Sequence, residues 1–336
     1  ADELANLGVR VSNLEKKVGN LYWSGDARMR YTASSLKDKK DAYDGRIRLN
    51  VKGQVNDATY VQGQFVNNMN FKDEASSDTT MAQIYVNHNF NKNVAVRLGR
   101  QPIAFGNQGG WLYNGLEGYD GAQASYNNGK LALTTGFGQL NASDMTDDTD
   151  DHGNVTSYGV TGTDMYFAKG AYDFGFAKLG ADYVKFQGDT NSTDHYFAGQ
   201  ELYGINLNIP VQKFNVFGEY WKNTTWGDYD TAWNAGLSYG KADWKKAGTW
   251  DLSVAYNDVD YGVYFGGGTW HNDMLKNLNN SKYIEADNLT FWTAIANVTL
   301  QKNVQLHAEY AFGADAEGTE GVDPDDSWTV SLNYKF

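Results

Sequence analysis

The feature that most constrains this chain is a two-residue alternation of apolar and polar side chains, repeated along most of its length. The clearest case is the segment 326–336, in which every second residue from Trp328 to Phe336 is apolar and the residues between them are polar. Successive side chains of a β-strand point to opposite faces. This period therefore predicts strands with one apolar face and one polar face.

Aromatic residues lie at one or both ends of several apolar faces, with aliphatic or small residues between them, as at 250–256 and 292–300. Trp and Tyr rings settle at the headgroup level of a bilayer. This preference helps to account for an aromatic content of 15% in a chain of 336 residues. No stretch approaches the roughly 20 consecutive apolar residues of a spanning helix. The pattern predicts an all-β fold, a transmembrane antiparallel β-barrel.

About 16 segments carry the alternation, and barrels of roughly 16–18 strands enclose an aqueous channel. Short turns containing Asn, Gly or Pro alternate with long connections, so the short turns are expected on the periplasmic side and the long loops outside. The predicted strands are 22–33, 43–56, 58–71, 80–90, 93–100, 119–127, 130–138, 162–173, 176–186, 198–210, 213–223, 231–240, 249–257, 287–300, 304–312 and 326–336.

Residues 1–21 have a different period from the barrel segment, which we place at 22–336. Apolar residues recur there at alternating spacings of 3 and 4, which is the seam of a coiled coil. We interpret the segment as the end of a periplasmic coiled-coil stalk whose seam continues upstream or self-associates. An amphipathic helix packed on its own barrel is the alternative. The seam residues are Leu4, Leu7, Val11, Leu14, Val18 and Leu21.

The polar faces of the strands are expected to line a wet lumen, and their cations are distributed unevenly. Five cations share parity on the first two predicted strands, which places them as a basic ladder on one wall, and two more lie on the fifth strand. The alternative is that these arginines pair with neighbouring carboxylates. The predicted pore-lining cations are Arg28, Arg30, Arg46, Arg48, Lys52, Arg97 and Arg100.

The connection 101–118 is Gly-rich, but it also contains Phe105 and the apolar run 111–113, which makes it too apolar for a free loop. We expect it to fold inward and constrict the pore. Glu117 and Asp120 would then face the basic ladder and set up a transverse field at the narrowest point.

Several functional classes are disfavoured by composition and motifs. A net charge of −13 argues against a nucleic-acid partner, and the chain has no Cys for a thiolate metal site. The five His have no partners at metal-ligand spacing, so we predict no metal, no cofactor and no enzyme activity. The acidic run 144–151 fails the EF-hand spacing because His152 occupies the glycine position. A solvated loop is preferred there, with cation bridging to lipopolysaccharide as an alternative.

Three short motifs resemble the OmpM-type outer-membrane porins: the junction 14–31, the run 94–101 that ends Leu-Gly-Arg-Gln, and the segment 334–336. The position of 101–118 after the fifth strand is similar to that of the constriction loop of trimeric porins. The resemblance implies a homotrimeric, 16-stranded porin with a coiled-coil stalk in the outer membrane of a diderm, Gram-negative-type bacterium. In that family an N-terminal surface-layer-homology (SLH) domain binds the cell wall. This sequence does not contain that domain, so contact with peptidoglycan or a secondary cell-wall polymer is expected only through it.

We therefore predict a porin for passive diffusion of small hydrophilic solutes and ions, in contact with outer-membrane lipid and lipopolysaccharide. A channel specific for a sugar or peptide is an alternative, suggested by Tyr60, Tyr166 and Trp221 near the lumen face and by the run 111–113. A tether from outer membrane to cell wall in the full-length protein is a third hypothesis. Ion selectivity stays open, because the acidic total charge and the basic ladder favour opposite ions.

Overall fold

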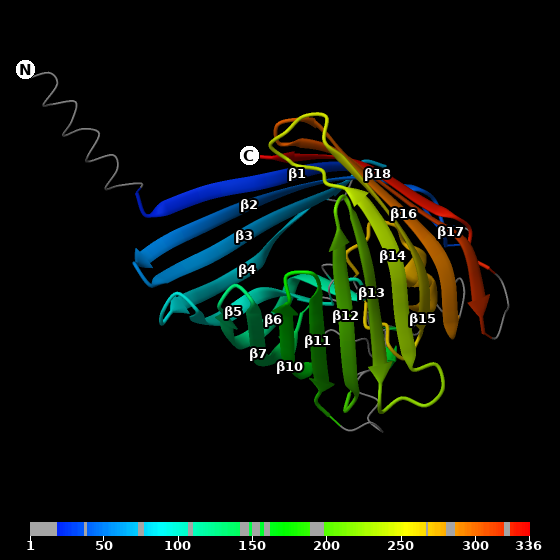
Figure 1. Ribbon diagram of the computed structural model, residues 1–336, viewed down its shortest axis with the longest axis horizontal. Coiled ribbons are helices and arrows are strands. Elements are labelled where there is room, and N and C mark those ends of the chain that lie inside the picture. Colours follow the sequence, from blue (N-terminus) through cyan, green and yellow to red (C-terminus); the bar gives the residue numbers. More distant parts are fainter. Residues whose placement is uncertain are drawn as a thin grey trace, which may run out of the picture.

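Each of the 16 alternating segments of the sequence is a strand of one closed antiparallel barrel (Figure 1). The computed structural model describes residues 19–36, 39–72, 77–106, 110–141, 148–149, 155–157, 162–188, 198–266, 268–279, 286–318 and 323–336. The barrel strands are β1 (Leu21–Ala33), β2 (Ala42–Asn56), β3 (Thr59–Asn70), β4 (Ser77–Asn89), β5 (Val94–Phe105), β6 (Tyr113–Asn127), β7 (Leu131–Leu140), β10 (Asp164–Asp173), β11 (Lys178–Phe186), β12 (Glu201–Val211), β13 (Phe214–Asn223), β14 (Thr231–Gly240), β15 (Trp250–Asp260), β16 (Asn288–Gln301), β17 (Val304–Glu317) and β18 (Ser327–Lys335).

The barrel closes where β1 pairs with β18, the strand farthest from it in the sequence. Met29 of β1 lies opposite Leu332 on one side and Gly45 of β2 on the other. The ladder continues beyond β18, because Gly25 N donates to Phe336 O over 2.8 Å and Phe336 N donates to Gly25 O over 3.0 Å. Closure leaves the barrel without an unpaired strand edge.

Two further predictions concern the coiled-coil segment 1–21 and the loop 139–161. Residues 1–18, with the seam positions from Leu4 to Val18, lie outside the described residues. Leu21, predicted as the last seam residue, is instead the first residue of β1 and lies opposite Gly53. The predicted loop 139–161 contains a short two-stranded sheet of β8 (Asp148–Thr149) and β9 (Val155–Ser157).

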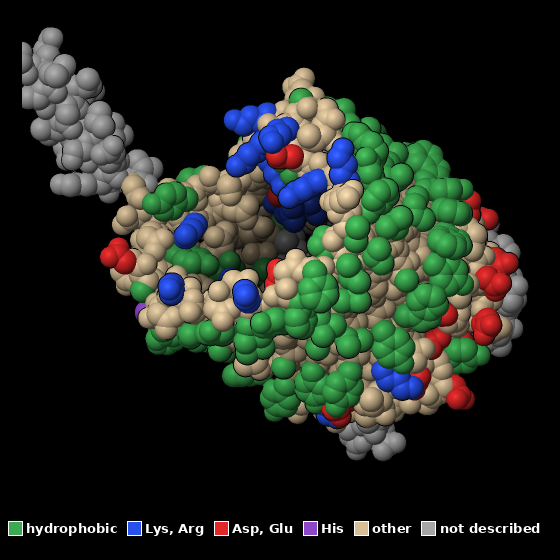
Figure 2. Space-filling view, viewed as in Figure 1, with side chains coloured by type: hydrophobic (Ala, Val, Ile, Leu, Met, Phe, Trp, Pro, Cys, Tyr) green, Lys and Arg blue, Asp and Glu red, His purple; other side chains and the backbone are tan. Residues whose placement is uncertain are grey.

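The outer face of the barrel carries an apolar band edged by aromatic rings, and hydrophobic side chains cover much of the outer surface in Figure 2. At the long-loop end, the rings of Trp233 and Tyr256 lie 5.5 Å apart, centroid to centroid. At the short-turn end, the Tyr239 and Trp250 rings are also 5.5 Å apart. Val254 lies between these levels and points outward. Such a surface requires an apolar solvent rather than water.

Among the described residues, no helix is both long enough and apolar enough to cross a bilayer. The 3-10 helix η1 (Met274–Asn279) interrupts the connection between β15 and β16.

The short turns follow the chemistry expected from the sequence. Between β6 and β7, the Asn128 carboxamide oxygen accepts hydrogen bonds from the backbone N–H groups of Lys130 and Leu131. Gly129 has φ +92°, a conformation that a side chain would strain. In the turn between β16 and β17, Asn303 takes φ 64°, which Asn tolerates better than most residues.

The connection 101–118 differs from the predicted loop. β5 continues to Phe105 and β6 begins at Tyr113, so most of the segment is the end of a long β-hairpin. A register shift between Gln101 and Ile103 marks the point where the hairpin departs from the regular barrel ladder.

A charge in the apolar band should destabilise the barrel, whereas a charge on the inner face should not. Val254→Lys is expected to lower the free energy of unfolding in lipid vesicles by about 2–4 kcal/mol, because the ammonium would face hydrocarbon. Ser253→Lys, one residue away on the inward face, is the matched control. Equal stability of the two variants in urea titrations would show that the outer face is not the apolar side.

Candidate functional site

The inward faces of β1 and β2 form an arginine wall, which we define as four guanidinium groups interleaved with two carboxylates. The strand register sets this arrangement because directly opposed residues share a face. The opposed pairs are Asp26 with Arg48, Arg28 with Arg46, and Arg30 with Asp44.

Each carboxylate of the wall forms ion pairs with two guanidinium groups. Asp44 lies 2.8 Å from Arg30 Nε and 3.5 Å from Arg28 Nη2. Asp26 repeats the pattern, 2.8 Å from Arg48 Nε and 3.5 Å from Arg46 Nη2. Four cations thus share two anions. The wall keeps a net charge of +2 although its carboxylates are all paired.

Two further predicted cations lie on the same inner surface and contact aromatic rings. The Lys52 ammonium lies 4.4 Å from the centroid of the Tyr60 ring. The Arg97 guanidinium carbon lies 4.5 Å from the Tyr85 centroid. These contacts extend the basic surface from β2 to β5 and hold the long side chains against the wall.

The prediction that Arg100 and Asp120 line the pore is wrong. Arg100 lies opposite Ile84, whose side chain is 52% exposed on the outer face, and it pairs with Asp120 at 2.8 Å on that face. Arg97 and Arg100 are three residues apart and therefore point to opposite sides of one strand. Tyr166, predicted near the lumen face, also points outward, opposite Phe137. The side chain of Glu117 lies outside the described part of the structure.

The hairpin end of β5 and β6 folds inward and contacts the inner face of the barrel at β10, β11 and β13. The backbone N–H of Gly106 donates to Asp182 on β11 over 3.1 Å. A Cβ atom on Gly106 would lie 1.8 Å from the carboxylate of Glu219 on β13, so only glycine allows this approach. Lys169 on β10 donates to the carbonyl of Ala104. The acids beside Gly106 come from β11 and β13 rather than from the hairpin itself.

An aromatic cluster surrounds this hairpin end. Phe105 is fully buried and contacts rings from β10, β13 and the connection between β15 and β16. The inward faces of β10 to β17 are therefore apolar at their long-loop ends, contrary to the expectation of polar inner faces throughout. The buried members of the cluster include Phe105, Trp111, Tyr113, Phe167, Phe186, Trp221, Phe265 and Phe291.

A second segment, 261–279, also folds into the barrel, and the sequence analysis did not anticipate it. Thr269 N donates to Gly110 O over 3.0 Å, and the rings of Tyr113 and Phe265 stack with centroids 5.1 Å apart. The two inward segments thus pack against each other. The signal that could have revealed them is a loss of alternation, as in 165–168, where both faces of the strand are apolar.

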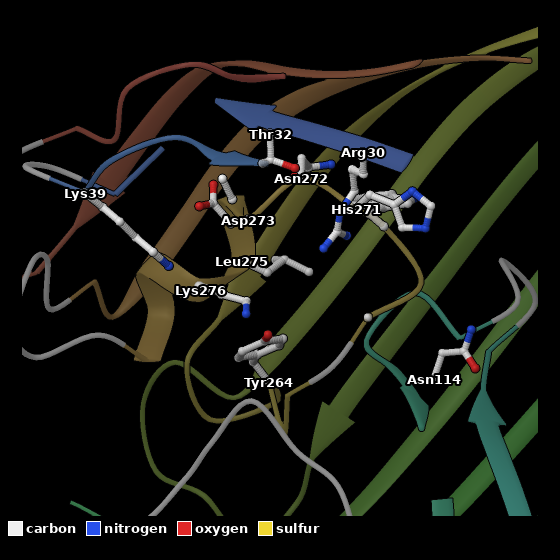
Figure 3. A pocket seen from close by; sticks show the side chains of 13 residues that line it. Arg30, Thr32, Lys39, Asn114, Tyr264, His271, Asn272, Asp273, Leu275 and Lys276 are labelled. Carbon is white, nitrogen blue, oxygen red and sulfur yellow. The ribbon is translucent and has the colours of Figure 1, made fainter. Parts of the chain in front are cut away.

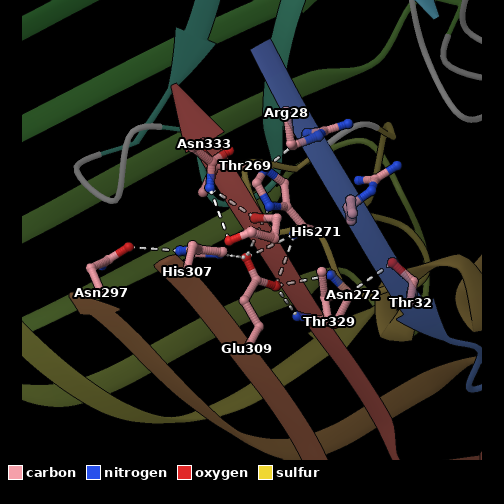
Figure 4. A network of polar contacts seen from close by, with 12 residues as sticks. Arg28, Thr32, Thr269, His271, Asn272, Asn297, His307, Glu309, Thr329 and Asn333 are labelled. Carbon is pink, nitrogen blue, oxygen red and sulfur yellow. Dashed lines mark hydrogen bonds and ion pairs between the residues drawn. The ribbon is translucent and has the colours of Figure 1, made fainter. Parts of the chain in front are cut away.

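Glu309 on β17 anchors the second segment (Figure 4). Its carboxylate accepts hydrogen bonds from the backbone N–H groups of His271 and Asn272 and from the Asn272 side chain, at 2.8–2.9 Å. His307 lies 2.9 Å from the same carboxylate. Arg28 approaches His271 Nε2 at 3.2 Å from the arginine wall. A buried charge with this many donors fixes the segment to the barrel wall.

His271, His307 and Glu309 are also a group with the ligand types that hold a metal, with candidate atoms within 4.8 Å of one another. In the structure, internal contacts engage His307, Glu309 and His271 Nε2, whereas the buried Nδ1 of His271 has no hydrogen-bond partner among the described residues. Arginine can only donate, so His271 Nε2 must accept and the ring proton lies on Nδ1, 4.0 Å from Glu309. Burial and the nearby Arg28 lower the pKa of His271 to about 3, which keeps the ring neutral.

The described architecture resembles that of solved outer-membrane barrels. Pseudomonas putida OprB aligns with a TM-score of 0.61 at 11% identity over 98% of this chain and 96% of its own. OmpT, an outer membrane protein of Vibrio cholerae in its trimer form, gives 0.58 at 12% identity over 94% and 99%. A mutant of Rh. blastica porin gives 0.58 at 11% identity over 94% and 100%. At these identities the likeness shows the fold alone. No protein-family model and no curated protein matches the chain.

Removing the Glu309 carboxylate should release the second inward segment. In Glu309→Ala, the amide hydrogens of His271 and Asn272 are expected to exchange roughly 10–100-fold faster, because hydrogen bonds to a charged group contribute about 1.5–3 kcal/mol. Glu317→Ala, on the exposed end of the same strand, should leave them unchanged. Hydrogen exchange followed by mass spectrometry measures both, and unchanged protection in Glu309→Ala would contradict the anchoring role.

Proposed function

We propose that this chain is an outer-membrane channel through which small hydrophilic solutes and ions diffuse passively, without a cofactor. The observation that carries the proposal is the combination of a closed 16-stranded barrel, an apolar outer band and a charged inner wall. An enzyme would need a set of reacting groups positioned around an open site, and the conspicuous histidine–carboxylate group serves as an anchor instead.

We further propose that the two inward segments set the constriction. The hairpin end of β5 and β6 and the segment 261–279 occupy the lumen next to β10–β17, which leaves the passage beside the arginine wall. Asp182 on β11 and Glu219 on β13 lie beside Gly106 of the hairpin, so the proposed passage has a basic side and a side that carries buried acids. A transverse field of this kind favours hydrated polar solutes over apolar ones.

The proposed oligomer is a homotrimer. The Arg100–Asp120 pair lies outward between apolar residues of the band, next to Leu98, which is 55% exposed. Charges facing hydrocarbon are costly, so a protein surface is their expected cover. The aromatic edge found on β14 and β15 has no counterpart at these positions of β5 and β6. The heptad seam in 1–21 and the OmpM-type resemblance favour the same threefold association.

The other proposed partners of the protein follow from its proposed place in the outer membrane. Outer-membrane lipid would cover the apolar band, and lipopolysaccharide would meet the long loops. Peptidoglycan or a secondary cell-wall polymer would bind only through an N-terminal SLH domain of the OmpM type.

A substrate-specific channel is the second candidate, and a cavity favours it. A space of about 330 Å³ opens between β1 and the second inward segment, with Arg30, Trp270 and Lys276 in its lining. Flux that saturates with one solute would support specificity, whereas flux that rises linearly with concentration would support general diffusion.

The channel proposal predicts ohmic single-channel currents in planar bilayers, and a protein that inserts without conducting would refute it. Neutralising the wall in Arg46→Gln/Arg48→Gln removes its excess of two positive charges. The ratio of chloride to potassium permeability should fall by roughly twofold or more, read as a reversal potential in a salt gradient. Lys185→Gln/Lys222→Gln removes the same charge from the outward face and should leave the ratio unchanged.

The trimer proposal predicts that breaking one ion pair weakens association. Arg100→Ala leaves Asp120 in the proposed interface without its ion-pair partner and is expected to cost about 3 kcal/mol per interface. The double variant Arg100→Leu/Asp120→Leu removes both charges and should restore much of the loss. Thermal dissociation followed by semi-native electrophoresis measures the effect. A monomeric wild type, or equal dissociation temperatures of the wild type and the two variants, would contradict the assignment.

A further inference from the structure

The cations of the cavity beside the arginine wall come from three parts of the chain, and Asn114 of β6 also lines the cavity (Figure 3). Arg30 comes from β1, Lys39 from the connection between β1 and β2, and Lys276 from η1. Figure 3 shows these three side chains directed toward one space. Its volume of about 330 Å³ lies within the range of small-molecule sites, roughly 300–1,000 Å³.

The charges around the cavity are unbalanced. Three cations line it against one carboxylate, that of Asp273, and the Asp44 carboxylate outside the lining pairs with Arg30, so these described groups have a net charge of 3 − 2 = +1. The Asp273 carboxylate is already engaged, because it accepts hydrogen bonds from Ser34 Oγ over 2.7 Å and from the N–H and Oγ of Ser35 over 2.8 Å. Its negative charge is thus held toward the connection between β1 and β2.

The neighbouring groups leave this positive excess in place. Arg28 shares the Asp44 carboxylate with Arg30 and brings one further positive charge. The buried Glu309 carboxylate, which accepts hydrogen bonds from His271 and Asn272, brings one negative charge. His271 borders the cavity as a neutral ring. Low-dielectric walls strengthen the attraction of a concave basic surface for anions.

The other lining groups suit an organic anion. Asn114 and Asn272 place carboxamide groups at the edge of the cavity, and Trp270 and Leu275 provide apolar surface. Asn114 is held in place, because its Nδ2 donates to Thr269 Oγ1 over 3.2 Å. A few polar groups set among apolar surface are typical of sites that orient a small ligand.

We propose that this cavity is a binding site for small organic polyanions, with carboxylate or phosphate groups held by Arg30, Lys39 and Lys276. The inference rests on the proposed channel function, because the site lies inside the barrel and would load solutes onto the arginine wall. Its position on the inner side of β1 excludes the headgroups of the surrounding bilayer as the ligand.

The test uses the full chain in planar bilayers, with citrate added on the long-loop side. Citrate is expected to reduce the open-channel current with a saturating dependence, whereas sucrose at equal concentration should not saturate. In Lys39→Met/Lys276→Met, half-saturation should require at least about tenfold more citrate, because two of the three cations are lost. Lys178→Met, which removes a lumen charge at another cavity, should shift half-saturation by less than about twofold.

A second measurement separates this inference from the channel proposal. Isothermal titration of the detergent-solubilised protein with citrate should give one site per chain, lost in the double variant and retained in Lys178→Met. Binding without conduction would refute the channel but support the site. Conduction without saturable citrate binding would overturn the site alone. Folding of the Lys276→Met protein is checked by its heat-modifiable migration in electrophoresis. If that migration is lost, Lys39→Met alone, in the exposed connection between β1 and β2, replaces the double variant. The citrate concentration at half-saturation should then rise by a smaller factor.

Discussion

The rest of the structure depends on one constraint: a strand in an apolar phase can place its backbone hydrogen bonds only on its neighbours. β1 meets this constraint by pairing with β18, and the pairing continues to Phe336. Once the sheet is closed, each strand has an outer and an inner side, and the alternation in the sequence assigns side chains to them. The apolar band and the arginine wall are two results of the same closure.

A barrel of this size encloses more space than its own inward side chains can fill. The chain fills part of the space with two inward segments, and the aromatic cluster is the core that they form with the inner faces of β10–β17. Polar anchors at either end hold this core in place. Gly106 meets Asp182 on one side, and Glu309 holds His271 and Asn272 on the other. The passage that we propose beside β1 and β2 would therefore be defined by packing as well as by charge.

The charges of the inner surface are balanced locally but not completely. Two carboxylates shared among four guanidinium groups hold the arginines rigidly and still leave positive potential along the passage. The sequence allowed two interpretations of these arginines, as a basic ladder or as partners of neighbouring carboxylates. Both hold, because the carboxylates are paired and the arginines outnumber them. The acidic total charge of the chain, −13, does not describe this surface, because screening limits each charge to about 8 Å in physiological salt.

The sequence by itself determined the strands, the short turns and the inward position of residues such as Arg46, because strand period and turn chemistry act between near neighbours. It also contained the evidence against Arg100, whose parity is opposite to that of Arg97. Only the tertiary structure decided what the long connections do. Arg28 meets His271 across 243 positions of the chain, and Glu309 meets it across 38. Contacts between such distant positions depend on the closed barrel, which first brings their segments into one lumen, and no local pattern encodes them.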